Sequence, residues 1–418
     1  MVGVVVTYCL LLSALAGKSY LFVLGSQVWR VQMAAVVLLV SVGLFHSLPR
    51  YRACRLDHCG LPLQIKASLS LLLLWAMTSC VAQENWLGNV AFLLVHAGMI
   101  YLLCVIGAES MCATSKMRCI DVALVPLSLM AIASMAIYVS GPSRLSFEGR
   151  FHGLYRNAII AGQMFGLTSL LLFWRALHAQ RRSWIGWALF SVTLPCLLVT
   201  RTRTDILGTL IGLLTCSLSA MYNSTEAALW RRTRVVLACC VLLTMAFVAW
   251  MTRPGADINP LRDYFRMSGD RDDILRARYE YWQTGLGKLS MENVLGEGPL
   301  AKYAGQLSRD QSGYVVEGNM HNAFLSMSQY YGWPGAVLLI IFMASLVGAL
   351  VKRKDPYATL GLSLLALGLT NCLSENWLLT FATPLDVYSW FVLGIALRRP
   401  RSTSEFAANS GRIPARCV

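Results

Sequence analysis

A histidine at the edge of a long apolar run is the first candidate for chemistry in this sequence. Residues 317–340 read EGNMHNAFLSMSQYYGWPGAVLLI, in which a polar lead precedes a half-polar stretch, a Gly-Trp-Pro-Gly break and a purely apolar run. A helix that begins near His321, with Asn319 as its N-cap, would place the imidazole at a positive helix end that disfavours its charged form. A neutral histidine can accept a proton from a hydroxyl group. The alternative is a histidine that only satisfies loop carbonyls.

Arginines form the second group of candidates. Arg201 and Arg203 lie in a very short polar gap, LLVTRTRTDILGTL, where a guanidinium drawn into hydrocarbon is costly. An anionic ligand at the membrane surface would offset that cost, whereas the alternative is that the side chains extend to lipid headgroups. Ligand binding is favoured for Arg203, and both alternatives stay open for Arg201. Further arginines lie in the polar segments 141–156 and 252–320: Arg150, Arg156, Arg276 and Arg278.

The composition indicates which elements must position these residues. Of 418 residues, 56% are hydrophobic and 14% are charged, which is more apolar surface than a soluble core can bury. Apolar runs of about 20 residues, the length that crosses a bilayer, recur along the chain. We expect an all-α polytopic integral membrane protein with about twelve transmembrane helices. Their predicted ranges are 4–17, 20–47, 62–82, 86–108, 119–140, 157–178, 184–200, 204–222, 235–251, 333–351, 357–373 and 380–397.

The charge pattern predicts the topology. Lysine and arginine cluster in alternate gaps between the apolar runs, which places those gaps and both termini in the cytoplasm. Helices 1–9 then fall in residues 1–251, a large periplasmic loop with amphipathic helices in 252–320, helices 10–12 in 321–398, and a cytoplasmic tail in 399–418. Much of the net charge of +15 serves this topology, so no nucleic-acid partner is expected.

The long loop has two recognisable parts. Residues 270–282 can form an amphipathic helix with Asp270, Asp272 and Asp273 in its first turn, and residues 296–299, Gly-Glu-Gly-Pro, must form a turn. The acidic cluster either holds a divalent cation or marks a helix N-terminus with arginine partners, and the second interpretation is favoured. The segment RACRLDHC offers poor spacing for a tetrahedral metal site. We therefore expect no metal and no cofactor.

Four short motifs follow one another on the predicted outer side. They are 150-RFHGLYRN-157, the pair Thr202-Arg203 before an apolar span, 278-RYEYW-282 followed by Gly-Glu-Gly, and 321-HN followed by YGWPG. In this order and spacing they resemble the O-antigen ligase and O-antigen polymerase superfamily of bacterial envelope glycosyltransferases, over residues 140–380. Two positions depart from the family pattern, because Arg156 stands where proline is frequent and Thr202 replaces a serine.

The resemblance implies a reaction and a set of partners. A preassembled glycan would move from undecaprenyl pyrophosphate to an acceptor hydroxyl at the periplasmic face of the bacterial inner membrane, with inversion and without metal. The acceptor would be lipid A–core or a second lipid-linked glycan, and membrane lipids would surround the site. His321 would be the general base, and the pyrophosphate would be bound by Arg203 and Arg278, with Arg150 and Arg156 as weaker candidates. The supporting residues would be Asn157, Asn322 and Glu375.

Several functions remain open at this point. A ligase, a polymerase and a protein O-oligosaccharyltransferase of this superfamily need the same arginines and the same base. A compact chain with one dominant periplasmic loop is more similar to the ligases, so O-antigen ligation is the favoured prediction. The alternative from a different class, a secondary transporter, would show two related halves and helices broken at the midplane. No internal repeat is evident, and polar residues concentrate outside the spans.

Overall fold

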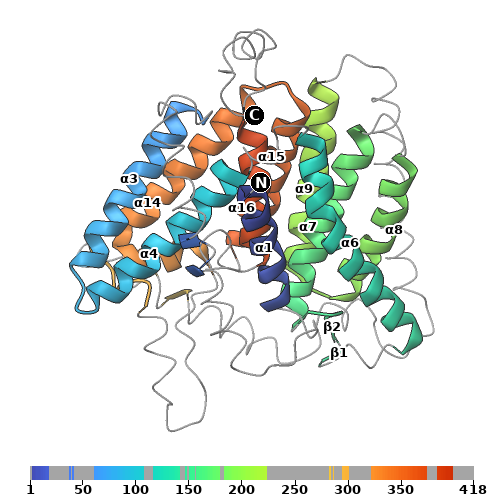
Figure 1. Cartoon of the computed structure of the whole chain (residues 1–418), viewed down its shortest axis with the longest axis horizontal. Coiled ribbons are helices and arrows are strands. Elements are labelled where there is room, and N and C mark those ends of the chain that lie inside the picture. Colours follow the sequence, from blue (N-terminus) through green and yellow to red (C-terminus); the bar gives the residue numbers. More distant parts are fainter. Residues whose placement is uncertain are drawn as a thin grey trace, which may run out of the picture.

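The described part of the protein is a bundle of α-helices with one short β-hairpin (Figure 1). The structure is a computed structural model that describes residues 2–17, 37–38, 40–41, 61–107, 116–141, 146–147, 150–155, 157–178, 183–223, 282–283, 286, 294–300, 322–373 and 384–398. Within these ranges the hairpin is the only sheet. The all-α expectation is therefore confirmed.

The helices follow the predicted spans closely. They are α1 (Val2–Gly17), α3 (Leu63–Val81), α4 (Trp86–Tyr101) with the π-helical continuation η2 (Leu102–Gly107), α6 (Lys116–Ser140), α7 (Ala158–His178), α8 (Ser183–Val199), α9 (Arg203–Asn223), α14 (Ala323–Val351), α15 (Pro356–Cys372) and α16 (Pro384–Leu397). The predicted spans 20–47 and 235–251 lie almost wholly outside the described residues.

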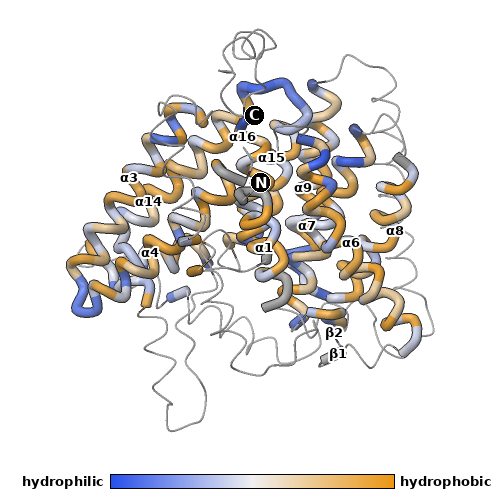
Figure 2. The backbone as a smooth tube through the Cα atoms, viewed as in Figure 1, coloured by the Kyte–Doolittle hydropathy of each residue, from blue (hydrophilic) through white to orange (hydrophobic). Residues whose placement is uncertain are grey.

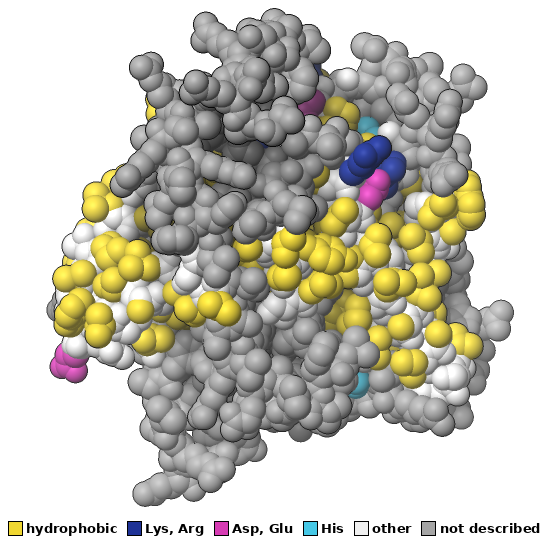
Figure 3. All heavy atoms as spheres, in the orientation of Figure 1, with side chains coloured by type: hydrophobic (Ala, Val, Ile, Leu, Met, Phe, Trp, Pro, Cys, Tyr) yellow, Lys and Arg dark blue, Asp and Glu magenta, His cyan; other side chains and the backbone are white. Residues whose placement is uncertain are grey.

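Six helices in the described ranges are long and apolar enough to cross a membrane: α3, α4 with η2, α6, α7, α9 and α14. Hydrophobic residues run along the middle of the helices and hydrophilic ones gather at their ends (Figure 2). On the face shown in Figure 3, hydrophobic side chains form a broad belt. Large apolar side chains such as Leu74, Leu129 and Trp184 are exposed, as lipid-facing residues must be. The chain is a multi-pass membrane protein; the total of twelve spans, the side of the termini and the periplasmic loop stay predictions.

Helix α9 packs tightly between α7 and α15 because glycines line both contacts. A Cβ atom added at Gly208 would lie 3.0 Å from the carbonyl oxygen of Leu367, and one at Gly212 would lie 3.1 Å from that of Ser363. On the other side, a Cβ at Gly166 of α7 would collide with the hydroxyl of Thr209. Small residues allow helix backbones to approach closely where no hydrophobic effect drives association. These helices form one layer, which we call the α7–α9–α15 layer.

Helix α14 is broken near its start. Tyr331 (φ −129°, ψ 18°) and Gly332 (φ 71°, ψ 175°) are not helical, and Pro334 follows. The predicted break at this point is confirmed. The 19 residues after Gly332 span about 28 Å at helical rise, which matches the hydrocarbon thickness, so residues 323–331 are not needed for crossing. We call residues 323–331 the crossing half-helix, because they run across from the end of α15 to α3.

The crossing half-helix runs between two other helices. At its start, Asn322 Nδ2 donates to the carbonyl of Leu373, at the C-terminal end of α15 (3.3 Å). At its end, Trp75 Nε1 of α3 donates to the carbonyl of Tyr331 (2.8 Å). Asn322 is also the N-cap, because its Oδ1 accepts from the backbone N–H groups of Phe324 (3.0 Å) and Leu325 (3.2 Å). The prediction that Asn319 caps this helix was wrong, since Asn322 holds the helix start three residues later.

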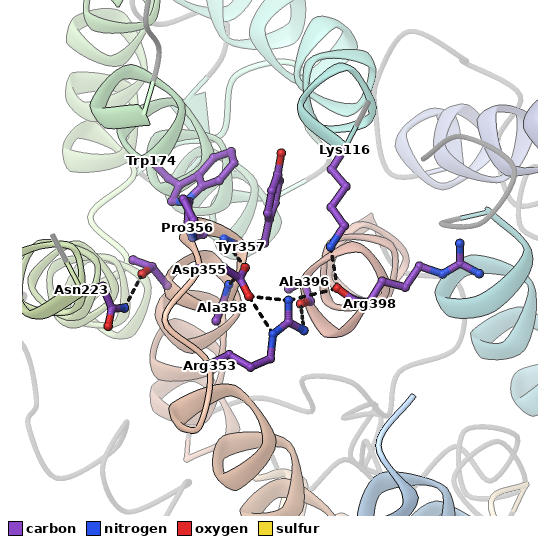
Figure 4. A network of polar contacts seen from close by, with 11 residues as sticks. Lys116, Trp174, Asn223, Arg353, Asp355, Pro356, Tyr357, Ala358, Ala396 and Arg398 are labelled. Atoms are coloured by element: carbon purple, nitrogen blue, oxygen red, sulfur yellow. Dashed lines mark hydrogen bonds and ion pairs between the residues drawn. The ribbon is translucent and has the colours of Figure 1, made fainter. Parts of the chain in front are cut away.

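Three of the basic gaps, which hold Lys116, Arg353 and Arg398, meet at one end of the bundle, which we call the basic end (Figure 4). Arg353, between α14 and α15, pairs with Asp355 (2.6 Å) and donates to the carbonyls of Ala396 (2.6 Å) and Arg398 (3.0 Å) at the end of α16. Lys116 Nζ, at the start of α6, donates to the same Arg398 carbonyl (2.5 Å). This agrees with the alternating charge pattern, which requires these gaps to share a side.

Candidate functional site

The opposite end of the bundle, which we call the hairpin end, carries strands β1 (Ser146–Phe147) and β2 (Arg150–Phe151). The strands pair antiparallel, with Phe147 opposite Arg150. Arg150 Nη2 donates to the backbone carbonyl of Arg201, in the turn between α8 and α9 (3.2 Å). The structure therefore brings two of the predicted arginine segments, 51 positions apart in the chain, into direct contact.

The motif that follows Arg150 anchors this contact. Phe151 stacks on Phe165 of α7, with ring centroids 6.0 Å apart, and Tyr155 meets the same ring edge-on at 5.5 Å. Gly153 has φ 55°, and a Cβ there would lie 2.6 Å from Ser134 Oγ of α6. Glycine adopts this left-handed backbone without strain. Burial raises the pKa of Tyr155, so its phenol stays neutral. The aromatic and glycine positions thus fix the backbone that presents Arg150.

Asn157 has a local role in the same segment. Its Oδ1 accepts from the backbone N–H of Ile160 (2.8 Å), and its own carbonyl accepts from the N–H of Ala161 (3.1 Å), so it caps α7. A side-chain cap satisfies one of the N–H groups that a helix start leaves without an intrahelical partner. Asn157 is exposed beside the Arg150 segment. Its contact with a ligand stays a prediction.

The α8–α9 turn separates threonines from arginines. Thr200 and Thr202 are buried, and their hydroxyls are 2.8 Å apart, whereas Arg201 and Arg203 are exposed. Thr202 is the residue before α9, and its carbonyl accepts from the N–H of Ile206 (3.0 Å). Arg201 has φ 56°, a left-handed conformation that is uncommon for a residue with a side chain. The alternating Thr-Arg-Thr-Arg sequence therefore directs both guanidinium groups outward.

A carboxylate lies directly beneath this turn. Asp205, in the first turn of α9, is 1% exposed, and a Cβ at Gly162 of α7 would lie 2.5 Å from its Oδ2. The positive end of a helix stabilises an acidic group in its first turn. Ionisable residues within membrane spans are candidates for function. Sequence reasoning missed Asp205, although an acidic residue two places after Arg203 and inside an apolar run was a visible signal.

Helix α15 connects the α8–α9 turn to the start of α14. Asn371 is 1% exposed and lies near Gly208, where an added Cβ would be 3.7 Å from its Nδ2. Within the described ranges neither side-chain atom of Asn371 has a hydrogen-bond partner. Two residues later, the Leu373 carbonyl accepts from Asn322. Arg150, Asn157, Arg203 and Asn322 therefore all lie at the hairpin end, with α15 packed between α9 and α14.

Four of the predicted site residues lie outside the described residues: His321, Arg278, Arg156 and Glu375. Their roles stay predictions. His321 immediately precedes the N-cap Asn322 in the chain, and Asn322 lies at the hairpin end. The acidic cluster at 270–273 and the segment RACRLDHC are also outside. Among the described residues no group of three or more metal-ligating side chains gathers.

Fold and site together define a multi-pass helical membrane protein with arginines exposed at one end. Residues 188–340 match the family model described as O-antigen ligase. The matched range begins within α8, includes Arg203 and ends in α14 beyond its kink. The resemblance to the O-antigen ligase superfamily is thereby confirmed, and it supports a membrane glycosyltransferase of the ligase and polymerase family. No curated protein matches the chain.

Proposed function

We propose that this protein transfers a preassembled glycan from undecaprenyl pyrophosphate to an acceptor hydroxyl on the periplasmic side of the bacterial inner membrane. The favoured acceptor is lipid A–core, which makes the protein an O-antigen ligase. One observation carries the proposal: within the range that matches the O-antigen ligase family, a buried-threonine turn exposes Arg201 and Arg203 beside Arg150.

The exposed arginines suit the leaving group of this reaction. Guanidinium groups bind phosphate oxygens in a two-pronged geometry that lysine cannot reproduce. Each such charged hydrogen bond contributes about 1.5–3 kcal/mol. Negative charge grows on the pyrophosphate as its bond to the sugar breaks, so a bond that strengthens during the reaction lowers the barrier. We assign this role to Arg203, with Arg150 beside it and Arg278 from the predicted periplasmic loop.

His321 is assigned as the general base. It would take the proton of the acceptor hydroxyl while that oxygen attacks the anomeric carbon, and the bond from that carbon to the pyrophosphate would break. Attack from the side opposite the leaving group inverts the anomeric configuration. Asn322 supports the assignment indirectly, because it caps α14 and bonds to α15, which fixes the backbone beside His321.

The first experiment deletes the gene in its host and compares the lipopolysaccharide with the extracted undecaprenyl-linked glycans. We expect bare lipid A–core, with long polymer accumulating on undecaprenyl. Reintroduction of the wild-type gene should restore the ladder of long lipopolysaccharide, and reintroduction of His321→Ala should not.

Other outcomes of the same experiment would redirect the proposal. Lipid A–core capped by a single repeat would show a polymerase, which adds one lipid-linked chain to another. An unchanged lipopolysaccharide profile would exclude ligation, and glycoprotein staining of the same strains would then test a protein O-oligosaccharyltransferase.

A further inference from the structure

Residues 294–300, which contain the predicted Gly-Glu-Gly-Pro turn, dock against the kink of α14. The N–H of Glu297 donates to the carbonyl of Gln329 (2.7 Å), and the N–H of Gly298 donates to that of Tyr330 (3.0 Å). In an unbroken helix the Tyr330 carbonyl would accept from residue 334, which is proline and has no N–H. The docked segment therefore supplies donors that the break removes.

The docking depends on two glycines within residues 294–300, Gly296 and Gly298. Gly296 has φ 71°, and a Cβ there would lie 2.5 Å from the backbone nitrogen of Gly332 and 2.6 Å from the carbonyl carbon of Tyr330. Contacts this short with backbone atoms require the backbone to move. Gly298 also has a left-handed backbone, with φ 84°. No other residue type fits position 296 without displacing the segment.

The other side of the segment is attached to α3 and α4. Gln83 Nε2, just after α3, donates to the carbonyl of Gly296 (2.5 Å), and Ser79 Oγ of α3 donates to the carbonyl of Leu295. The N–H of Leu300 donates to Asn89 Oδ1 of α4 (3.1 Å). The segment is thus fixed to two helices while it holds the end of the crossing half-helix.

One side-chain bond strengthens the contact. Gln329 Nε2 donates to Glu297 Oε2 (3.0 Å). Gln329 is 4% exposed, whereas Glu297 is exposed. The carboxylate therefore acts on the half-helix through a buried amide, which a neutral isostere of glutamate could also accept from.

We propose that residues 294–300 are a positioning element for the catalytic base. By holding the Gln329–Tyr331 end of the crossing half-helix, they fix its direction and hence the location of its capped start, which follows His321. The inference rests on the proposed function because it takes His321 as the base. It assigns Gly296 and Glu297 no contact with the substrate; both act through α14.

Gly296→Ala tests the inference, with Gly348→Ala in α14 as the matched control. A Cβ at Gly348 would meet only Gln64 Nε2, at an ordinary 3.8 Å. Donor titration with purified protein, extracted undecaprenyl-linked glycan and lipid A–core would give kcat and KM. We expect kcat of Gly296→Ala to fall about 100-fold with little change in the donor KM, since small misplacements of a reacting group cost that much. Gly348→Ala should match the wild type.

Hydrogen exchange provides a readout that needs no substrate. In Gly296→Ala the amides of 326–331 should exchange about tenfold faster or more, because local opening becomes easier, while those of 336–350 stay protected. Unchanged exchange at 326–331 would overturn the docking. Faster exchange with a wild-type kcat would overturn the positioning role, as would a raised donor KM at wild-type kcat, which indicates direct substrate contact.

A second pair of variants covers the case in which Gly296→Ala does not fold. Glu297→Gln keeps an oxygen that accepts from Gln329, whereas Glu297→Leu does not. We expect Glu297→Gln to retain wild-type kcat and Glu297→Leu to lose about tenfold, the effect of one hydrogen bond. Equal loss in both would mean that the charge itself acts, which overturns the inference. A wild type that transfers no glycan would overturn the proposed function, while hydrogen exchange would still decide the docking.

Discussion

The two ends of the bundle use arginine in opposite ways. At the basic end, the Arg353 side chain is partly buried and is held by Asp355 and two backbone carbonyls. Arg175 is likewise bound to Asp121 at 2.6 Å. At the hairpin end, Arg201 and Arg203 extend from a turn whose buried side chains are threonines. Arg175 and Arg353 therefore join helices at the basic end, whereas Arg201 and Arg203 are exposed at the hairpin end.

This difference separates stability from function. A partly buried arginine bound to a carboxylate is costly to break, because its partner is left without compensation. Interactions of an exposed arginine contribute less to folding than those of a buried one, and the proposed function assigns the charge of Arg203 to ligand binding. Changes at the hairpin end should therefore reduce transfer without unfolding the protein. Changes at the basic end should lower the stability without reducing transfer per folded molecule.

The largest effect is expected for His321→Ala, at the residue that precedes the N-cap Asn322 in the chain. Loss of a general base lowers kcat by a factor of about 100–10,000, and the protein should remain inserted and folded. Glycan transfer to lipid A–core by membranes with matched protein levels would measure it. Normal transfer by a well-expressed variant would remove His321 from the mechanism.

Arg203→Lys comes next. The charge is kept but the two-pronged binding of a phosphate is lost, so we expect kcat/KM to fall by about 10–100-fold. Arg175→Lys is the control for the same chemical change at the basic end and should leave kcat/KM near the wild-type value. Full activity of Arg203→Lys would indicate that the side chain only reaches lipid headgroups.

Arg353→Gln should show the opposite pattern. Removing this charge leaves the Asp355 carboxylate without its ion-pair partner and the Ala396 carbonyl without its arginine donor, which should lower the stability by about 1–3 kcal/mol. The thermal midpoint of the purified protein would fall, while transfer per folded molecule would stay unchanged at low temperature. A reduced kcat with an unchanged midpoint would break the proposed division between the two ends.

The smallest effect is expected for Asp355→Asn. Asp355 also caps α15, because its Oδ1 accepts from the N–H groups of Tyr357 and Ala358 at 3.0 and 3.1 Å. Asparagine caps helices about as well as aspartate, so only the ion pair with Arg353 is lost, and we expect a decrease of about 1 kcal/mol or less. The thermal midpoint relative to Arg353→Gln would separate capping from pairing.

The apolar runs predicted the helices because length and composition alone decide whether a segment can cross a bilayer. Start and end residues were harder, as the N-cap of α14 shows. Asn319 and Asn322 are equally suitable by type, and the contact of Asn322 with Leu373 on another helix distinguishes them. Such a contact is not visible in a local pattern.

The candidate site was only partly predictable for the same reason. The outward direction of Arg203 followed from its place in a short polar gap. The docking of Gly296 onto Gly332 did not, because two glycines 36 positions apart carry no periodic signal of their contact. The buried Asp205 was obscured because arginine, two residues earlier, accounted for the polarity of the gap.

The close glycine contacts in the α7–α9–α15 layer have a mechanical consequence. Where the α9 and α15 backbones touch without intervening side chains, no rotamer change can absorb a small displacement, so these two helices must tilt together. The turn that carries Arg201 and Arg203 leads directly into α9, and Arg150 donates a hydrogen bond to that turn. A thinner bilayer or moderate heating should therefore first change the distance from α9 and α15 to α3. The spacing among these arginines should change last.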